Sequence, residues 1–158
     1  MAGNGQLDLG AGAGTAPDPQ VPAHPFRALA HFPAAMTAHV RYTAIDAHRP
    51  ATTSPAVIDE VIRKTIGFDG LLMSDDVSMK ALSGSVGESA TAALAAGCDL
   101  VLHCNGILAE MEAVAASTAK LEGRPLARLK AALAVLQRQE PFEQHLAEAA
   151  IARVLSVA

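Results

Sequence analysis

Three short apolar segments end in polar residues and alternate with segments of helical periodicity. They cover residues 35–40, 70–75 and 99–103. Their starts recur roughly every 30 residues, the length of one strand–helix unit. Because these segments do not alternate apolar and polar residues, they indicate parallel strands that are covered on both faces. The sequence therefore predicts an α/β fold, either a doubly wound sheet or part of a (β/α)8 barrel.

The segment between the first two strands has the clearest helix signals. Ser54 suits a helix cap and Pro55 suits the first helical position, while Gly67 ends the pattern. On the polar face, the spacing predicts two ion pairs, Asp59 with Arg63 and Glu60 with Lys64. Later helices are predicted around residues 90–97, 111–119, 126–139 and 142–157.

Length and charge restrict the possible classes of protein. A complete (β/α)8 barrel needs about 250 residues, more than the 158 present here. The net charge of -4, without a basic block, argues against nucleic acid or a membrane as partner. Residues 1–24 are rich in Gly, Ala and Pro, so we expect a disordered tail before a domain at 25–158.

The cysteine content and the motif content exclude several kinds of site. Cys98 and Cys104, if they share one strand, lie roughly 20 Å apart, too far for a disulfide. We interpret both as small buried residues in a reducing cytoplasm. The sequence has no zinc or nucleotide motif, so we expect neither a metal nor a cofactor.

The polar residues at the three strand ends are the candidate functional residues, because sites in such folds lie there. They are His39, the pair Asp75 and Asp76, and the pair His103 and Asn105. Asp75 has the position of a nucleophile, a general base or a metal ligand, but also of a turn cap. Asp76 is interpreted as a cap or as a support for Asp75. Each His is either a hydrogen-bonded core residue or part of a shared pocket.

Four motifs together resemble glycoside hydrolase family 3. They are MTAHV at 36–40, PATTSP at 50–55, IGFDGLLMSDDVSM at 66–79 and AAGCDLVLHCNG at 95–106. Within the family, the chain is most similar to the bacterial cytoplasmic β-N-acetylglucosaminidases of peptidoglycan recycling. The resemblance implies the last three βα units of a TIM barrel, followed by additional helices.

The resemblance also implies a mechanism and a substrate. Asp75 matches the nucleophile of a retaining glycosidase, which forms a covalent glycosyl-enzyme that water then hydrolyses. His39 is implied to line the sugar pocket, and we assign substrate contacts to Met36, His103 and Asn105 as well. The implied substrates are muropeptides with a terminal N-acetylglucosamine, β-linked to 1,6-anhydro-N-acetylmuramic acid, and the implied location is the cytoplasm.

The chain also departs from the family pattern. Nothing in it matches the first five strands, the Lys-His pair that contacts the sugar, or the loop with the acid/base Asp-Ser-His. The tripeptide at 31–33, His-Phe-Pro, is similar to part of a segment near that loop, but it directly precedes the first predicted strand. We therefore expect the closing portion of a larger domain, with the nucleophile and without the acid/base.

Two alternatives and one consequence remain open. The chain could be an inactive remnant that binds sugar without turnover. A metal-dependent hydrolase is the other alternative, with His39, Asp75, Asp76 and His103 as ligands. In either case, three βα units leave two sheet edges unpaired, so we expect self-association through these edges.

Overall fold

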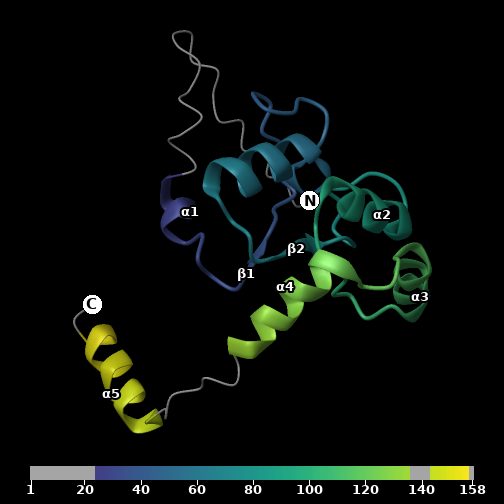
Figure 1. Ribbon diagram of the computed structural model, residues 1–158. Helices are drawn as coiled ribbons and strands as arrows, with labels where there is room; N and C mark the ends of the chain where they lie inside the picture. Colours follow the sequence, from purple (N-terminus) through teal and green to yellow (C-terminus); the bar gives the residue numbers. More distant parts are fainter. Residues whose placement is uncertain (1–23, 136–142, 157–158) are drawn as a thin grey trace.

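The computed structural model describes residues 24–135 and 143–156 (Figure 1). In these ranges, helices and strands follow one another in the predicted order. The elements are α1 (His24–Ala28), β1 (Ala34–Met36), η1 (Ala51–Thr53), η2 (Ala56–Ile66), β2 (Leu71–Asp76), α2 (Val86–Ala96), β3 (Leu100–Leu102), α3 (Leu108–Ser117), α4 (Gly123–Ala134) and α5 (Gln144–Leu155). The tail predicted for residues 1–24 lies outside the described residues, apart from His24.

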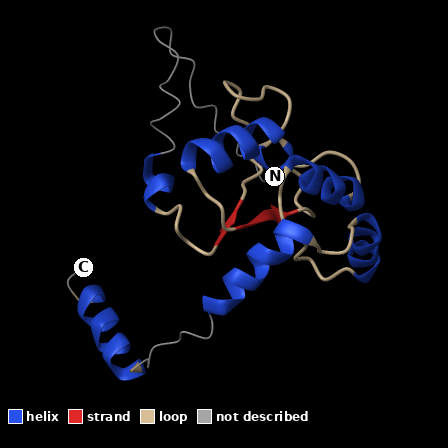
Figure 2. Ribbon diagram, viewed as in Figure 1, coloured by secondary structure: helices blue, strands red, loops and turns tan. Residues whose placement is uncertain are grey.

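The three strands form one parallel sheet in the order β1–β2–β3 (Figure 2). Each connection between neighbouring strands contains a helix, η2 in the first and α2 in the second. Parallel neighbours need such crossovers, because the chain must return to the same end of the sheet. The predicted α/β fold with parallel strands is confirmed.

The first strand is shorter than predicted. β1 ends at Met36 instead of continuing to residue 40, although the Thr37 N–H still donates to the carbonyl of Met73 at 2.9 Å. The Thr37 side chain bonds to the hydroxyl of Thr52, in η1, at 2.9 Å. His39 therefore lies in the loop after β1 rather than at the end of the strand.

The core lies on one face of the sheet. It consists of buried side chains from η2, β2, α2 and the turns beside them, namely Ile58, Phe68, Leu72, Ala93, Ala96 and Cys98. Ala35 and Val101 pack against this cluster from the outer strands. Neighbouring residues in a strand point to opposite faces, so the paired residues Met36 and Met73 lie on the other face. Half of the Met36 side chain is exposed there, and we call this the open face.

Helix η2 confirms one of the two predicted ion pairs, Glu60 with Lys64 at 2.7 Å, whereas the pair of Asp59 with Arg63 is wrong. Its i→i+5 winding differs from that of a regular α-helix, and Gly67 closes it in the left-handed conformation with φ 80°. Asp59 pairs with Lys64 at 2.9 Å instead of with Arg63. Arg63 is turned inward and donates to the buried carboxylate of Asp99 at 2.8 Å.

Asp99 organises the amino-terminal end of the sheet. Only 3% of its side chain is exposed, and it accepts hydrogen bonds from Arg63, from Arg128 of α4 and from the Leu72 N–H. Arg128 also pairs with Asp69 just before β2. These bonds join η2, α4 and the starts of β2 and β3. We call Asp69, Asp99, Arg63 and Arg128 the ion network.

The cysteine prediction is correct in one part and wrong in another. Both cysteines are free, but only Cys98 is buried, whereas Cys104 is exposed in the loop after β3. Burial raises the pKa of the Cys98 thiol to about 11. Among the described residues, no helix has the length and apolar character that a membrane span requires.

Candidate active site

Asp75 lies at the carboxyl end of β2, where the regular pairing with β3 is interrupted. Met73 is opposite Leu100 and Asp76 is opposite Leu102, so three steps along β2 match two steps along β3. The extra residue forms a β-bulge, a feature that re-aims a side chain and often lies next to an active site. Asp75 is half-buried, and its Oδ1 accepts the N–H of Asp76 at 2.8 Å.

Asp76 connects the ends of two strands. Its carboxylate accepts hydrogen bonds from the N–H and the hydroxyl of Ser78, at 3.0 and 2.7 Å, and so caps the turn after β2. It also accepts the N–H of Cys104, after β3, at 3.2 Å. Burial raises the pKa of Asp76, but the bonds from Ser78 and Cys104 outweigh it and keep the pKa below its ordinary value. Asp76 is therefore an anion at neutral pH.

His39 joins the same cluster through its ring. The Nε2 atom lies 2.9 Å from the carbonyl oxygen of Asp76, and because a carbonyl only accepts, Nε2 donates. The Nδ1 atom lies 2.8 Å from the hydroxyl of Thr52, which in turn lies 2.9 Å from the hydroxyl of Thr37. Both ring nitrogens therefore have protein partners, and the ring braces the end of β2.

His103 and Asn105 are turned toward helix α3. The Nε2 of His103 lies 3.0 Å from Glu110, and the side-chain amide of Asn105 donates to the same carboxylate at 2.5 Å. Hydrogen bonds from His103 and Asn105 lower the pKa of Glu110. The His103 ring is buried, and its Nδ1 has no hydrogen-bond partner among the described residues.

The structure thus divides the predicted site residues into three groups. Asp75, Asp76 and His39 form one hydrogen-bonded cluster at the carboxyl end of β2. His103 and Asn105 form a second cluster with Glu110. Met36 lies on the open face of β1, and its side chain is not part of either hydrogen-bonded cluster. The substrate contacts assigned to these residues remain predictions.

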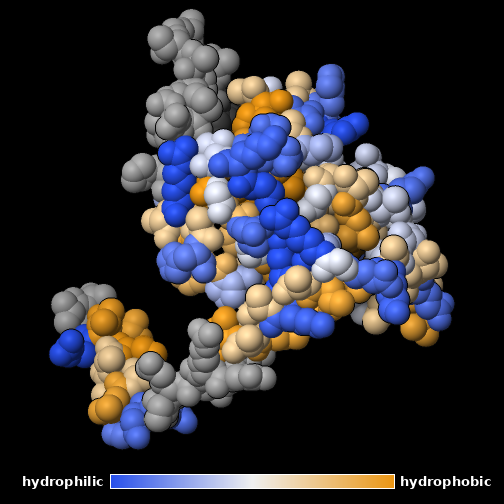
Figure 3. Space-filling model, in the orientation of Figure 1, coloured by the Kyte–Doolittle hydropathy of each residue, from blue (hydrophilic) through white to orange (hydrophobic). Residues whose placement is uncertain are grey.

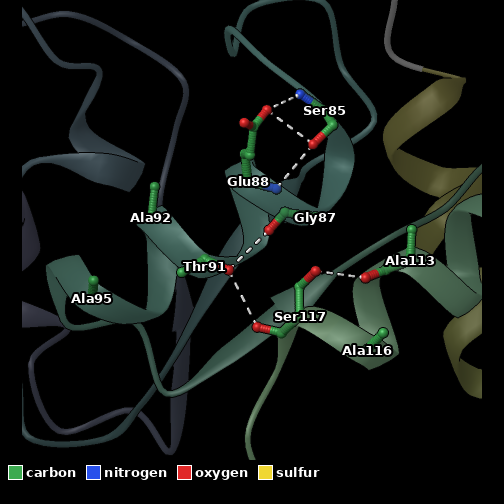
Figure 4. Close-up of a pocket in the computed structure, with 9 residues that line it drawn as sticks. All are labelled: Ser85, Gly87, Glu88, Thr91, Ala92, Ala95, Ala113, Ala116 and Ser117. Atoms are coloured by element: carbon green, nitrogen blue, oxygen red, sulfur yellow. Dashed lines mark hydrogen bonds between the residues drawn. The ribbon is translucent and has the colours of Figure 1, made fainter.

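One groove lies away from these strand ends. It has a volume of about 550 Å³ and runs between α2 and α3 (Figure 4). The Ser85 and Glu88 side chains at its rim bond to each other in a helix cap, and Thr91 donates to backbone carbonyls of the two helices. The polar side chains at this groove already bond to each other or to the backbone of α2 and α3. We therefore place the candidate site at Asp75 instead.

Sequence reasoning did not identify several residues that support the candidate site. Thr52 and Ser74 are fully buried, and both make hydrogen bonds that hold the strand ends. Thr52 lies in the PATTSP motif and Ser74 in the SDD motif. The motifs therefore indicate the segments that contain these residues, but not the groups to which they bond. Glu110 had no signal, because an acid in the first turn of a helix is ordinary.

The four residues considered for a metal site are not gathered around one point. Within the described ranges, no three or more His, Cys, Asp or Glu side chains are grouped so that they could hold a metal ion. His39 and His103 are instead committed to Thr52 and Glu110. The described part of the chain thus offers no ligand set for the metal-dependent alternative.

Comparison of the sequence with known families gives a match along most of the chain. Residues 12–156 match the profile described as "Glycosyl hydrolase family 3 N terminal domain". The chain belongs to glycosyl hydrolase family 3. Its curated relatives include the beta-hexosaminidases of Alkalilimnicola ehrlichii, 49% identical over 85 residues, and Methylobacillus flagellatus, 41% identical over 98 residues. These matches cover 51% and 61% of the chain but 24% and 28% of the relatives.

Solved structures of the family have the same fold. The β-N-acetylglucosaminidase of Thermotoga maritima is 34% identical, with a TM-score of 0.52 over 64% of this chain and 25% of that protein. The family 3 β-N-acetylglucosaminidase of a Paenibacillus strain is 30% identical, with a TM-score of 0.58 over 75% and 26%. The chain therefore spans about a quarter of the family 3 proteins that it matches, and it has the α/β fold of a partial TIM barrel.

Proposed function

We propose that this chain carries the nucleophile of a retaining β-N-acetylglucosaminidase, and that Asp75 is this nucleophile. The position of Asp75 is the observation that supports the proposal most strongly. It ends the central strand of the sheet, at a bulge, with one carboxylate oxygen held by the Asp76 N–H. A relative that is 49% identical over 85 residues is named beta-hexosaminidase.

The proposed reaction has two steps at the anomeric carbon. The Asp75 carboxylate attacks this carbon, a carbon–oxygen bond forms, and the bond to the leaving-group oxygen breaks. The leaving oxygen takes a proton from an acid, for which this chain has no match to the family motif. Water then attacks the anomeric carbon, the bond from this carbon to Asp75 breaks, and the proton of the water passes to the group that acted as acid in the first step, which releases N-acetylglucosamine and restores the carboxylate.

The proposed substrate is a muropeptide fragment with a terminal β-linked N-acetylglucosamine, which places the protein in peptidoglycan recycling in the cytoplasm. One relative of known structure, from Neisseria gonorrhoeae, was solved in complex with N-trifluoroacetyl-D-glucosamine and is 32% identical, with a TM-score of 0.51. Its ligand carries an N-acylated amino sugar. This similarity supports an N-acetylglucosamine group as the recognised part of the substrate.

Hydrolysis of nitrophenyl N-acetyl-β-glucosaminide tests the proposal, because its leaving group needs little help from an acid. We expect at least one equivalent of nitrophenolate per chain, unaffected by a chelator, and none from Asp75→Asn. Asp59→Asn is the matched control, since Asp59 is exposed and pairs with Lys64 of the same helix. Release that persists in Asp75→Asn would refute Asp75 as the nucleophile.

A second candidate function is sugar binding without turnover. It is favoured by the commitment of both His39 nitrogens to the protein and by the missing match for the acid/base. Binding of N-acetylglucosamine, seen by NMR, without any release of nitrophenolate would support this candidate.

We also propose that copies of this chain associate with one another. Among the described strands, β1 and β3 each pair only with β2, so each has an open edge. Helix α5 exposes an apolar stripe, visible in orange in Figure 3, that includes Leu146, Ile151 and Val154. Size-exclusion chromatography with light scattering is expected to show dimers or larger species. A compact monomer would contradict this.

A further inference from the structure

The bulge beside Asp75 is held by a side chain. At this point the N–H of Leu102 in β3 donates to the hydroxyl of Ser74, at 2.9 Å. On either side, backbone bonds join the strands, from Asp99 to Leu72 at 2.8 Å and from Val77 to Leu102 at 2.9 Å. The Ser74 hydroxyl therefore takes part in strand pairing where the register shifts.

Ser74 and Asp76 flank Asp75, and both are tied to β3 by their side chains. Ser74 accepts the N–H of Leu102, and Asp76 accepts the N–H of Cys104, two residues further along. Asp75 thus lies between two side-chain tethers. A main-chain segment fixed at both ends leaves the residue between them little freedom to rotate.

Burial makes the Ser74 tether sensitive to substitution. Ser74 has no exposed surface, and a buried amide that loses its acceptor is destabilised. Without the hydroxyl, the Leu102 N–H loses this acceptor and the pairing of β2 with β3 is weakened where the register already shifts. A register shift by one residue turns side chains to the opposite face of a sheet.

We propose that Ser74 is a positioning residue, whose hydroxyl fixes the bulge and, together with Asp76, directs the Asp75 carboxylate toward the open face of the sheet. This inference rests on the proposed role of Asp75 as the nucleophile. Ser74 itself makes no contact with substrate in this proposal. It acts only through the orientation of its neighbour.

The test uses Ser74→Ala and Ser74→Cys in the full chain. Alanine removes the hydroxyl, and cysteine keeps the volume but offers only a weak acceptor. Ser89→Ala is the matched control, because Ser89 is equally part of the buried interior but lies in α2. Three quantities are measured: hydrogen exchange of the Leu102 amide, the Asp75 side-chain rotamer from three-bond NMR couplings, and the rate of covalent labelling by an activated N-acetylglucosaminyl fluoride.

In both Ser74 variants, we expect exchange at Leu102 to rise about tenfold or more. Asp75 should change from one rotamer to an average of several, and labelling should slow, while Ser89→Ala matches the wild type. An Asp75 rotamer that stays single in both Ser74 variants would overturn the inference. If the wild type is not labelled at all, the proposed nucleophile fails, and the rotamer and exchange data still decide whether Ser74 positions Asp75.

Discussion

The two ends of the sheet hold their acidic side chains in opposite ways. At the amino-terminal end, both oxygens of Asp99 accept hydrogen bonds from arginines, and the side chain is buried. At the carboxyl end, Asp75 and Asp76 are held by backbone N–H groups and a hydroxyl. No ion pair between described residues includes either of them.

This difference separates a structural role from a reactive one. A carboxylate bound by two arginines is neutralised and held in place. Asp99 can therefore join η2 and α4 to the start of β3. A carboxylate held on one oxygen by an amide, like that of Asp75, has its other oxygen available for a reaction. The comparison therefore supports Asp75, and not the better-paired Asp99, as the nucleophile.

The largest effect on stability is expected at the amino-terminal end. Asp99→Asn leaves two partly buried guanidinium groups without their shared anion, which should lower the free energy of unfolding by about 3–5 kcal/mol. Urea denaturation followed by circular dichroism measures the loss. Asp59→Asn, at an exposed pair, should leave the curve almost unchanged. An equally small effect of Asp99→Asn on the free energy of unfolding would contradict a structural role for Asp99 at the amino-terminal end of the sheet.

A smaller loss of stability is expected from the hydrogen bonds that link Thr37, Thr52 and His39 near the carboxyl end of the sheet. Thr52→Val keeps the shape of a fully buried residue but leaves the His39 Nδ1 and the Thr37 hydroxyl without this partner. The expected cost is about 1–3 kcal/mol by thermal denaturation. The control is Thr53→Val, whose hydroxyl makes only a long bond of 3.4 Å to Pro50. Equal losses of unfolding free energy in the two variants would argue against a stabilising role for the hydrogen bonds of Thr52 to His39 and Thr37.

The smallest effect is a pH dependence at Asp76. Its pKa is lowered in the folded protein, so its stabilising contribution is complete above the unfolded value of about 3.9 and disappears as the pH falls through the folded pKa. The difference in unfolding free energy between the wild type and Asp76→Asn should therefore be constant near neutral pH and shrink below about pH 4. A difference that stays constant into this acidic range would contradict the hydrogen-bonding account of Asp76.

The order of strands and helices could be predicted because its signals are local. Helices η2 and α2 end at Gly67 and Gly97, each in the left-handed conformation that glycine favours, with φ of 80° and 114°. The position of Asp75 at the end of an apolar strand was visible in the same way. Such features depend on neighbours in the sequence.

The partners of the charged and hydroxyl side chains could not be predicted. Arg63 has the spacing of a surface ion pair, yet it bonds to Asp99, 36 residues away. The Ser74 hydroxyl bonds to Leu102 across 28 residues, at a bulge that no local pattern indicates. The sequence also overestimates the length of β1, which ends at Met36, just before Thr37 bonds to the distant Thr52. These features depend on contacts that exist only in the folded chain.

Covalent trapping tests the central claim most directly. The full chain is incubated with an activated fluorinated N-acetylglucosaminyl donor whose leaving group needs no protonation, and peptides are then mapped by mass spectrometry. We predict one sugar per chain, attached to the peptide that contains Asp75, and no label in Asp75→Asn. A label on another residue, or no label on a folded wild-type chain, would contradict the assignment of Asp75 as the nucleophile.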